Sequence, residues 1–271
     1  TSRPLPIPQK DHGLSFLDPS SRRRWITRAL LWLTYTIFLR WSAAHVFVAY
    51  NNYATARRSG LVSSGIVIYN GIKTTYLPRR EARAALEKIL RMPLGNRHIT
   101  GSIGRLAYPK NYEFLIEAAR SITDTLFIII GDGPEKKQYT TLIAHYNLAD
   151  RFILAGSHEH AEQYINAFDL FVLPSYYEGL SISLIDAMNA GIPSLVSRVG
   201  GNPEVVNETP EQLFTVNTLD EFITRYRALR NNPALCERLR IHNTIASARF
   251  SPHIMAEQYI KLIPNFKAQI P

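Results

Sequence analysis

The segment "TLFIIIGDGP", Thr125 to Pro134, decides the fold. Its first six residues form a nearly unbroken apolar run rich in β-branched side chains, which is typical of a strand buried on both faces of a sheet. The following "GDGP" predicts a turn, because Gly and Pro end regular structure. A dinucleotide loop of the G-x-G-x-x-G type is not favoured, since Lys136 stands where the third Gly is needed.

Strand-like and helical patterns alternate on both sides of this segment. Further strands are expected at 99–104, 151–156, 169–174, 193–197 and, more weakly, 212–216, with helices at 111–122, 135–148, 159–168 and 181–190. This alternation predicts a mostly parallel, doubly wound α/β sheet. Ligands of such sheets bind beyond the carboxyl ends of the strands.

The flanking segments have different patterns. After residue 218 the pattern is helical to the end of the chain. Before the alternation, residues 44–50 and 65–72 resemble strands, and 73–98 is a polar connector that holds one amphipathic helix. The first ten residues, "TSRPLPIPQK", have the pattern of neither helix nor strand.

Composition and charge restrict the class of protein. The chain has 271 residues, of which 46% are hydrophobic and 20% charged, as in a globular protein with room for more than one domain. The single cysteine, Cys236, excludes an internal disulfide and suggests a reducing compartment, so a cytoplasmic location is expected. The net charge is +9, but residues 1–60 hold nine basic against two acidic groups. The rest of the chain is nearly neutral, which disfavours a nucleic-acid partner.

The basic end contains one long apolar segment, "RRRWITRALLWLTYTIFLRW", from Arg22 to Trp41. Its uncharged part is too short to cross a bilayer, and no cleavage site follows that would indicate a signal peptide. Two interpretations remain. The segment forms a helix that contacts an anionic membrane face peripherally, or it forms a core helix with arginines at its solvated start.

The polar residues of interest follow the predicted strands. Arg105 and Lys110 come after the strand 99–104, and Glu178 comes after 169–174. Two cations at a strand end favour a diphosphate, and the start of the next helix, at Ser181, Ile182 and Ser183, offers free N–H groups to phosphate. Asp186, one turn further, is a candidate for the hydroxyls of a ribose. Glu178 would then face a sugar beyond the diphosphate.

A metal site is not predicted. The sequence has no D-x-D triplet and no cluster of cysteines and histidines that would hold a metal beside the diphosphate. His158 and His160 could form a ligand pair, but two histidines alone make a poor site, so a solvated helix start is favoured. The cations would take the place of a metal.

Several motifs in this order resemble the donor-binding half of a retaining glycosyltransferase of family four, which has the GT-B fold. They are "HGLSF" at His12, "IYNGI" (68–72), "GRLAYPK" (104–110), "IGDGP" (130–134), "LPSYYEGL" (173–180), "DAMNAGIPSLVS" (186–197) and "GGNPEVV" (200–206). The resemblance implies one complete Rossmann-like domain, residues 73–250, that binds a nucleotide-diphosphate sugar. It also implies that residues 1–72 are the remnant of an N-terminal acceptor-binding domain and that 251–271 form a helix crossing back toward it.

The resemblance also assigns roles. It implies that a hexose passes to a hydroxyl of a glycan or lipid-linked acceptor with retained configuration, without a cofactor. Arg105 and Lys110 would hold the diphosphate beside Gly104, Glu178 would lie near the donor sugar, and His12 would lie near the reacting sugar. Asp186 stands where the family commonly has Glu, and "PLPIPQKD" stands where an apolar strand normally precedes the "HG" loop. Two alternatives are a sugar-nucleotide epimerase of the same fold and a fragment that binds the donor without turnover.

Overall fold

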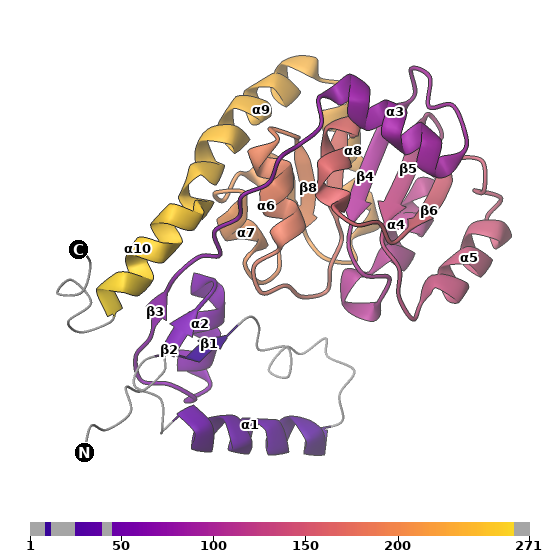
Figure 1. Cartoon of the computed structure of the whole chain (residues 1–271). Coiled ribbons are helices and arrows are strands. Elements are labelled where there is room, and N and C mark those ends of the chain that lie inside the picture. Colours follow the sequence, from indigo (N-terminus) through magenta and orange to yellow (C-terminus); the bar gives the residue numbers. More distant parts are fainter. Residues whose placement is uncertain (1–8, 12–24, 40–44, 263–271) are drawn as a thin grey trace.

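A computed structural model defines the fold for residues 9–11, 25–39 and 45–262 (Figure 1). Its larger sheet has six strands in the spatial order β6-β5-β4-β7-β8-β9, and all neighbours pair in parallel. The strands are β4 (His98–Ile103), β5 (Thr125–Ile130), β6 (Phe152–Gly156), β7 (Leu170–Leu173), β8 (Ser194–Ser197) and β9 (Leu213–Phe214). The predicted doubly wound sheet is therefore confirmed. The strand order reverses between β4 and β7, where ligands of such sheets bind.

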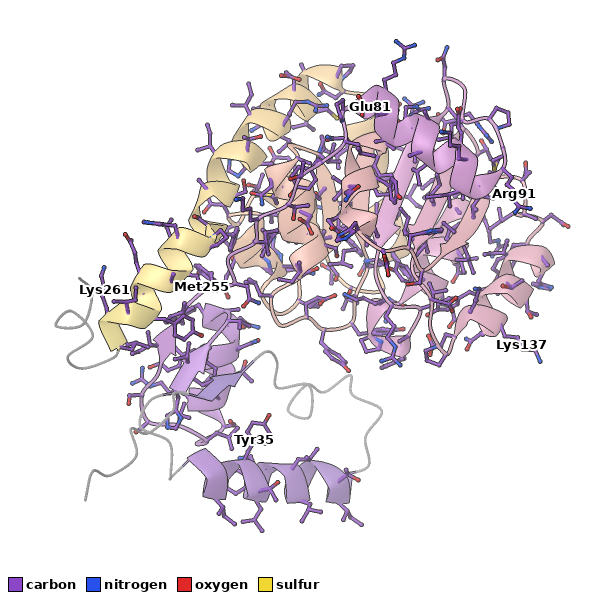
Figure 2. All side chains as sticks on the ribbon, viewed as in Figure 1. Tyr35, Glu81, Arg91, Lys137, Met255 and Lys261 are labelled. Atoms are coloured by element: carbon purple, nitrogen blue, oxygen red, sulfur yellow. The ribbon has the colours of Figure 1, made fainter. Side chains whose placement is uncertain are left out.

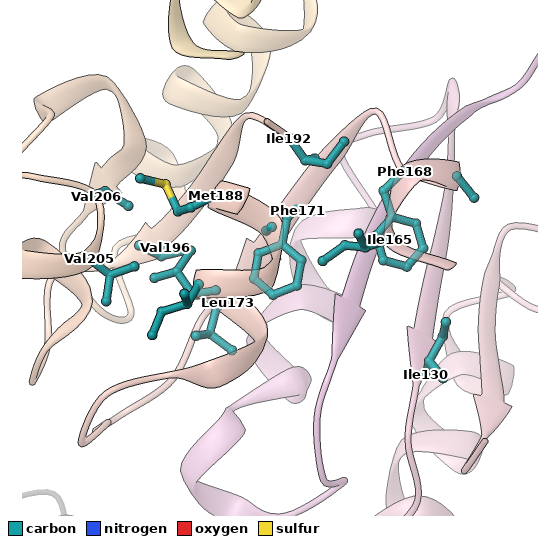
Figure 3. Packing of buried hydrophobic residues seen from close by; sticks show 14 of the residues in the cluster. Ile130, Ile165, Phe168, Phe171, Leu173, Met188, Ile192, Val196, Val205 and Val206 are labelled. Carbon is teal, nitrogen blue, oxygen red and sulfur yellow. The ribbon is translucent and has the colours of Figure 1, made fainter. Parts of the chain in front are cut away.

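Strand β5 lies in the middle of this core. All six residues of β5 are buried, and alternate side chains belong to the two hydrophobic clusters on opposite faces of the sheet. Helices α3 (Arg79–Leu90) and α6 (Ile182–Asn189) supply one cluster, whereas α4 (Tyr112–Ala119), α5 (Lys136–His145) and α8 (Leu219–Arg230) supply the other. Figure 3 shows the first cluster, in which Phe171 and Leu173 of β7 pack near Met188 of α6.

Some elements differ from the sequence prediction. Residues 159–168 form a 3₁₀ helix, η2 (Ala161–Ala167), instead of an α-helix. A short helix that the sequence analysis did not predict, α7 (Asn202–Val205), follows β8. Further 3₁₀ turns are η1 (Tyr108–Lys110), η3 (Pro210–Gln212) and η4 (Ala248–Phe250).

A second, smaller parallel sheet has the order β1-β2-β3, with strands β1 (Gln9–Asp11), β2 (His45–Phe47) and β3 (Ile66–Val67). The prediction of no regular structure in the first ten residues is wrong at its end, because Gln9 and Lys10 belong to β1 and pair with β2. The expected strand 44–50 is shorter than predicted, since α2 (Tyr50–Arg58) begins at its last residue.

Helix α1 (Trp25–Leu39) covers the small sheet with only one face. Leu31 and Tyr35 pack against the small-sheet cluster, and Figure 2 shows Tyr35 on the side of the helix that turns toward the sheet. Its other face carries four exposed apolar side chains, those of Ile26, Leu30, Leu33 and Ile37. The core-helix interpretation is therefore wrong for that face. Within the part of the chain that the structure describes, no helix is both long and apolar enough to span a bilayer.

The C-terminal helices run from the large sheet to the small one. Helix α9 (Pro233–Ser247) packs beside α6, and α10 (Pro252–Leu262) continues alongside β3 (Figure 1). The Gly71 N–H donates to Met255 Sδ at 3.3 Å. A Cβ on Gly71 would lie 2.4 Å from Pro252 Cα, so this close crossing requires glycine.

Candidate functional site

The loops after β4 and β5 are joined by backbone hydrogen bonds. Gly104 N–H donates to the Ile130 carbonyl at 3.1 Å, and Leu106 N–H donates to that of Asp132 at 3.0 Å. A Cβ on Gly131 would lie 2.0 Å from Gly104 O, and one on Gly133 would lie 2.3 Å from Leu106 O. The two glycines of "GDGP" therefore let the backbones approach each other, and the segment fixes the loop that carries Arg105 and Lys110.

The structure brings Lys110 and Glu178 together at the switch point of the sheet. Lys110 Nζ lies 2.7 Å from Glu178 Oε1, and both side chains are largely buried. The loops that carry them are further joined by the N–H of Tyr176, which donates to the Pro109 carbonyl, and by the stacked rings of Tyr108 and Tyr176. Two loops separated by about 70 residues of sequence thus form one wall of a site.

Ser175 also positions the Glu178 carboxylate. Its hydroxyl donates to Glu178 Oε1 at 2.6 Å, and Ser175 itself is fully buried. Its carbonyl accepts a hydrogen bond from Ser197 Oγ at 2.6 Å, which ties it to the end of β8. Ser175 was not predicted as a site residue; the only signal for it in the sequence is its place in the motif "LPSYYEGL", three residues before Glu178.

Gly200 fixes the backbone of Glu178. It has φ +52, and a Cβ there would lie 1.8 Å from the Glu178 carbonyl oxygen. The next residue, Gly201, donates its N–H to the Gly179 carbonyl at 3.0 Å. The "GGNPEVV" motif, which the sequence analysis used only as a mark of resemblance, thus supports the loop of the predicted sugar-facing acid.

Arg105 lies on the same loop as Lys110, two residues after the end of β4, and is exposed. Among the described residues, its guanidinium donates no hydrogen bond and forms no ion pair with a carboxylate. An exposed cation next to a buried one at the end of β4 is available to a ligand, because no internal partner competes for it.

The start of α6 faces the same end of the sheet. Ser181 is the N-cap and accepts from Leu184 N–H at 3.4 Å, while its hydroxyl lies 3.3 Å from that of Ser183. The N–H groups of the first turn have no acceptor within the helix, and their partial positive charge favours an anion. Ile182, although apolar, is 43% exposed there, which leaves room for a bound group against this turn.

Asp186 is less accessible than the sequence analysis expected. It is 4% exposed and accepts hydrogen bonds from Thr74 Oγ1 at 2.7 Å and from the Tyr76 hydroxyl at 3.0 Å, both from the connector between the two sheets. Burial raises the pKa of the Asp186 carboxyl, and the two hydroxyl donors oppose that rise. The structure therefore places Asp186 against the connector as well as on the helix of the predicted site.

The two acids share one geometric feature. Each uses a single oxygen for the scaffold, since both donors to Glu178 reach Oε1 and both donors to Asp186 reach Oδ1. Within the described residues, the other oxygen of each carboxylate receives no hydrogen bond. Carboxylate oxygens accept hydrogen bonds from hydroxyl groups, so each acid retains one acceptor for a polyhydroxylated ligand.

Two further predictions concern His12 and the histidines at 158 and 160. His12 lies outside the described residues, so its position relative to the site stays a prediction. In the described part of the chain, no group of three or more His, Cys, Asp or Glu residues could hold a metal ion. His158 Nε2 donates to the Ala155 carbonyl at 2.9 Å, and His160 is paired with Glu162.

Comparisons with known proteins match the larger sheet and its helices. The family described as Glycosyl transferases group 1 matches residues 91–244. An Escherichia coli protein named UDP-Gal:alpha-D-GlcNAc-diphosphoundecaprenol alpha-1,3-galactosyltransferase is 34% identical over 169 residues, which is 58% of this chain and 43% of the relative. The chain spans less than half the length of the curated relatives it matches first.

Two solved structures have a similar fold. Anabaena HepE in complex with UDP and glucose superimposes with a TM-score of 0.84 at 20% identity, covering 96% of this chain and 72% of HepE. Sucrose-phosphate synthase from Thermosynechococcus elongatus has a TM-score of 0.82 at 23% identity, covering 97% of this chain and 68% of the synthase. At these identities the likeness concerns the fold.

Proposed function

Because the chain belongs to the glycosyl transferases group 1 family, we propose that it binds a nucleotide-diphosphate sugar and transfers the hexose to an acceptor hydroxyl with retention. The product would be a cell-surface polysaccharide or a glycolipid. Support comes from the Escherichia coli relative, whose name includes a UDP-sugar and a lipid-linked acceptor, and from the HepE structure with UDP and glucose.

The observation that carries this proposal is the Lys110–Glu178 pair at the switch point. Arg105 lies on the same loop as Lys110, and Ser181, the N-cap of α6, stands three residues after Glu178. A diphosphate placed there would meet two cations and free helix N–H groups. During transfer, the bond from the anomeric carbon to the diphosphate oxygen breaks, and negative charge develops on that oxygen. Fixed cations stabilise this developing charge, which is the main electrostatic contribution that such a site can make.

The remaining steps concern the sugar and the acceptor. The acceptor oxygen forms the new bond on the face from which the diphosphate departs, and its proton passes to the departing phosphate oxygen. Glu178, with Oε1 held by Lys110 and Ser175, would accept a sugar hydroxyl at Oε2 and so orient the ring. Asp186 would do the same for a ribose hydroxyl.

The proposal is tested by titration calorimetry with UDP-hexoses and GDP-hexoses, followed by nuclear magnetic resonance of the bound donor. We expect at least one donor to bind saturably. We also expect the sugar of the bound donor to keep its configuration when no acceptor is present. Transfer is then assayed with lipid-linked and oligosaccharide acceptors. Epimerised donor in the absence of acceptor would favour an epimerase, and no binding of any nucleotide-sugar would contradict the proposal.

We further propose that α1 contacts an anionic membrane. Its exposed apolar residues, defined above, recur at helical spacing and form one stripe. The sequence places three arginines immediately before the helix and Arg40 immediately after it, and Arg57 and Arg58 are exposed on α2. Apolar burial of about 1.5–3 kcal/mol for each large side chain, with about 1 kcal/mol for each basic residue, would be enough for reversible binding.

Vesicle sedimentation tests the membrane contact. We expect the protein to bind vesicles of phosphatidylglycerol but not of phosphatidylcholine, and the double change Leu30→Glu and Leu33→Glu to reduce binding at least about tenfold. The matched control is Ile241→Glu with Ile245→Glu, which removes an exposed apolar pair from α9. Equal loss in both double variants, or a concentration-dependent dimer that the α1 variant abolishes, would contradict a membrane role.

A further inference from the structure

A second cluster of cations lies at the amino ends of the strands, opposite the candidate donor site. A polar cavity of about 400 Å³ opens there between α3, the 95–97 loop and the end of α8. Four arginines line it together with His98 at the start of β4 and Asp169 just before β7: Arg79, Arg83, Arg97 and Arg230. Neither the family match nor the named relatives assign a role to these residues.

The carboxylates near this cavity do not offset its arginines. Asp169 is the only acid in the lining, and it is shared by Arg79 at 2.5 Å, Arg83 at 3.9 Å and the Ile99 N–H at 2.8 Å. Outside the lining, Asp124 pairs with Arg230 at 3.2 Å. Glu87 also attracts the Arg83 guanidinium electrostatically, but its carboxylate accepts a hydrogen bond from the Leu94 N–H. Four fixed positive charges therefore converge on a cavity that one carboxylate lines.

Two buried polar atoms of the lining have no partner among the described residues. They are Nε2 of His98 and Nε of Arg230. Burial lowers the pKa of His98 to about 4, so its ring is neutral near pH 7 and can still donate one N–H. A buried donor without an acceptor is rare in native proteins and usually indicates a missing water or ion. Here the missing group must be an acceptor for Arg230, because Nε of arginine only donates.

From these observations we propose that this cavity is a second anion site that binds a phosphoryl oxyanion. Guanidinium groups offer planar pairs of donors that match phosphate oxygens, and several of them lie around one space. The same chemistry would bind free phosphate or the phosphate group of an ester. The site is separate from the candidate donor site, because the cavity lies at the start of β4 and β7 and the donor site lies beyond their ends.

Thermal unfolding with added sodium phosphate tests this site, with sodium chloride at matched ionic strength as the reference. We expect phosphate at about ten times its Kd to raise Tm by about 3 °C. The rise should persist in Arg105→Ala, which removes a cation of the donor site, and in Arg238→Gln, which removes an exposed arginine paired with Glu211. It should disappear in Arg230→Gln and in Arg97→Gln.

Arg97→Gln provides a second variant if Arg230→Gln does not fold. Among the described residues, the Arg97 guanidinium donates only to the nearby carbonyls of Pro93 and Leu94. Glycerol phosphate in place of inorganic phosphate then distinguishes an ester ligand from the free ion, through the larger Tm rise. A phosphate effect that is lost in Arg105→Ala but kept in Arg97→Gln would assign it to the donor site and overturn the inference. No effect of phosphate beyond chloride would overturn it as well.

Discussion

Arg105→Ala is expected to weaken UDP binding about 10- to 100-fold while leaving Tm unchanged. A charge-assisted hydrogen bond to phosphate contributes about 1.5–3 kcal/mol, and about 1.4 kcal/mol corresponds to a factor of ten. The stability should not change, because the side chain is exposed and has no partner among the described residues. Titration calorimetry measures the affinity, and Arg120→Ala, an exposed arginine paired with Glu117, is the matched control.

Lys110→Ala separates the two cations of the site. It should weaken UDP binding by a similar factor, but in addition it leaves Glu178 with Ser175 as its remaining side-chain donor among the described residues. A largely buried carboxylate that loses its cationic partner lowers the stability of the folded protein. Tm should therefore fall in Lys110→Ala and not in Arg105→Ala. UDP affinity that is unchanged in both variants would show that the diphosphate does not bind at the end of β4.

Asp186→Asn is expected to raise Tm near neutral pH and to weaken UDP binding about tenfold. The folded-state pKa of Asp186 is raised by burial, so the unfolded chain releases this proton first as pH rises. The carboxylate therefore lowers stability above the unfolded pKa of about 3.9, and asparagine removes that cost. Its amide oxygen can still accept from Thr74 and Tyr76. The gain should be about 1 kcal/mol, or roughly 2–4 °C.

Asp186→Asn also tests the ribose contact, through a comparison of its affinities for UDP and for pyrophosphate. Because Asp186 is proposed to meet only the ribose, Asp186→Asn should weaken UDP but leave pyrophosphate affinity unchanged, whereas Arg105→Ala should weaken both. The Tm difference from the wild-type chain should shrink toward zero as pH falls to about 4, where the unfolded carboxyl takes up its proton. A UDP affinity equal to wild type would show that Asp186 only fastens the connector.

The sheet and the central pair of the site could be predicted from sequence because both depend on local patterns. The buried run of β5 and its neighbours fixes the strands, and the GT-B-type fold expected from the motifs is confirmed. Lys110 and Glu178 each follow a strand within a few residues, and parallel strands present their carboxyl ends at one edge. Their meeting at 2.7 Å therefore follows from topology.

What the sequence did not predict depends on contacts between distant segments. The hydroxyls that hold Asp186 come from residues 112 and 110 positions earlier, in a connector with no motif of its own. The exposed stripe of α1 could not be separated from its buried face, because both are apolar and periodicity alone does not show which one packs. The arginine cavity combines four side chains from three segments, and no local pattern marks it.

The central claim is that a diphosphate lies between the two cations and the start of α6, and a crystal structure with bound UDP tests it most directly. The account predicts phosphate oxygens within about 3 Å of Lys110 Nζ, of the Arg105 guanidinium and of the N–H groups at Ile182 and Ser183. The ribose should lie toward Asp186. Well-defined UDP whose phosphates contact neither cation would contradict the account.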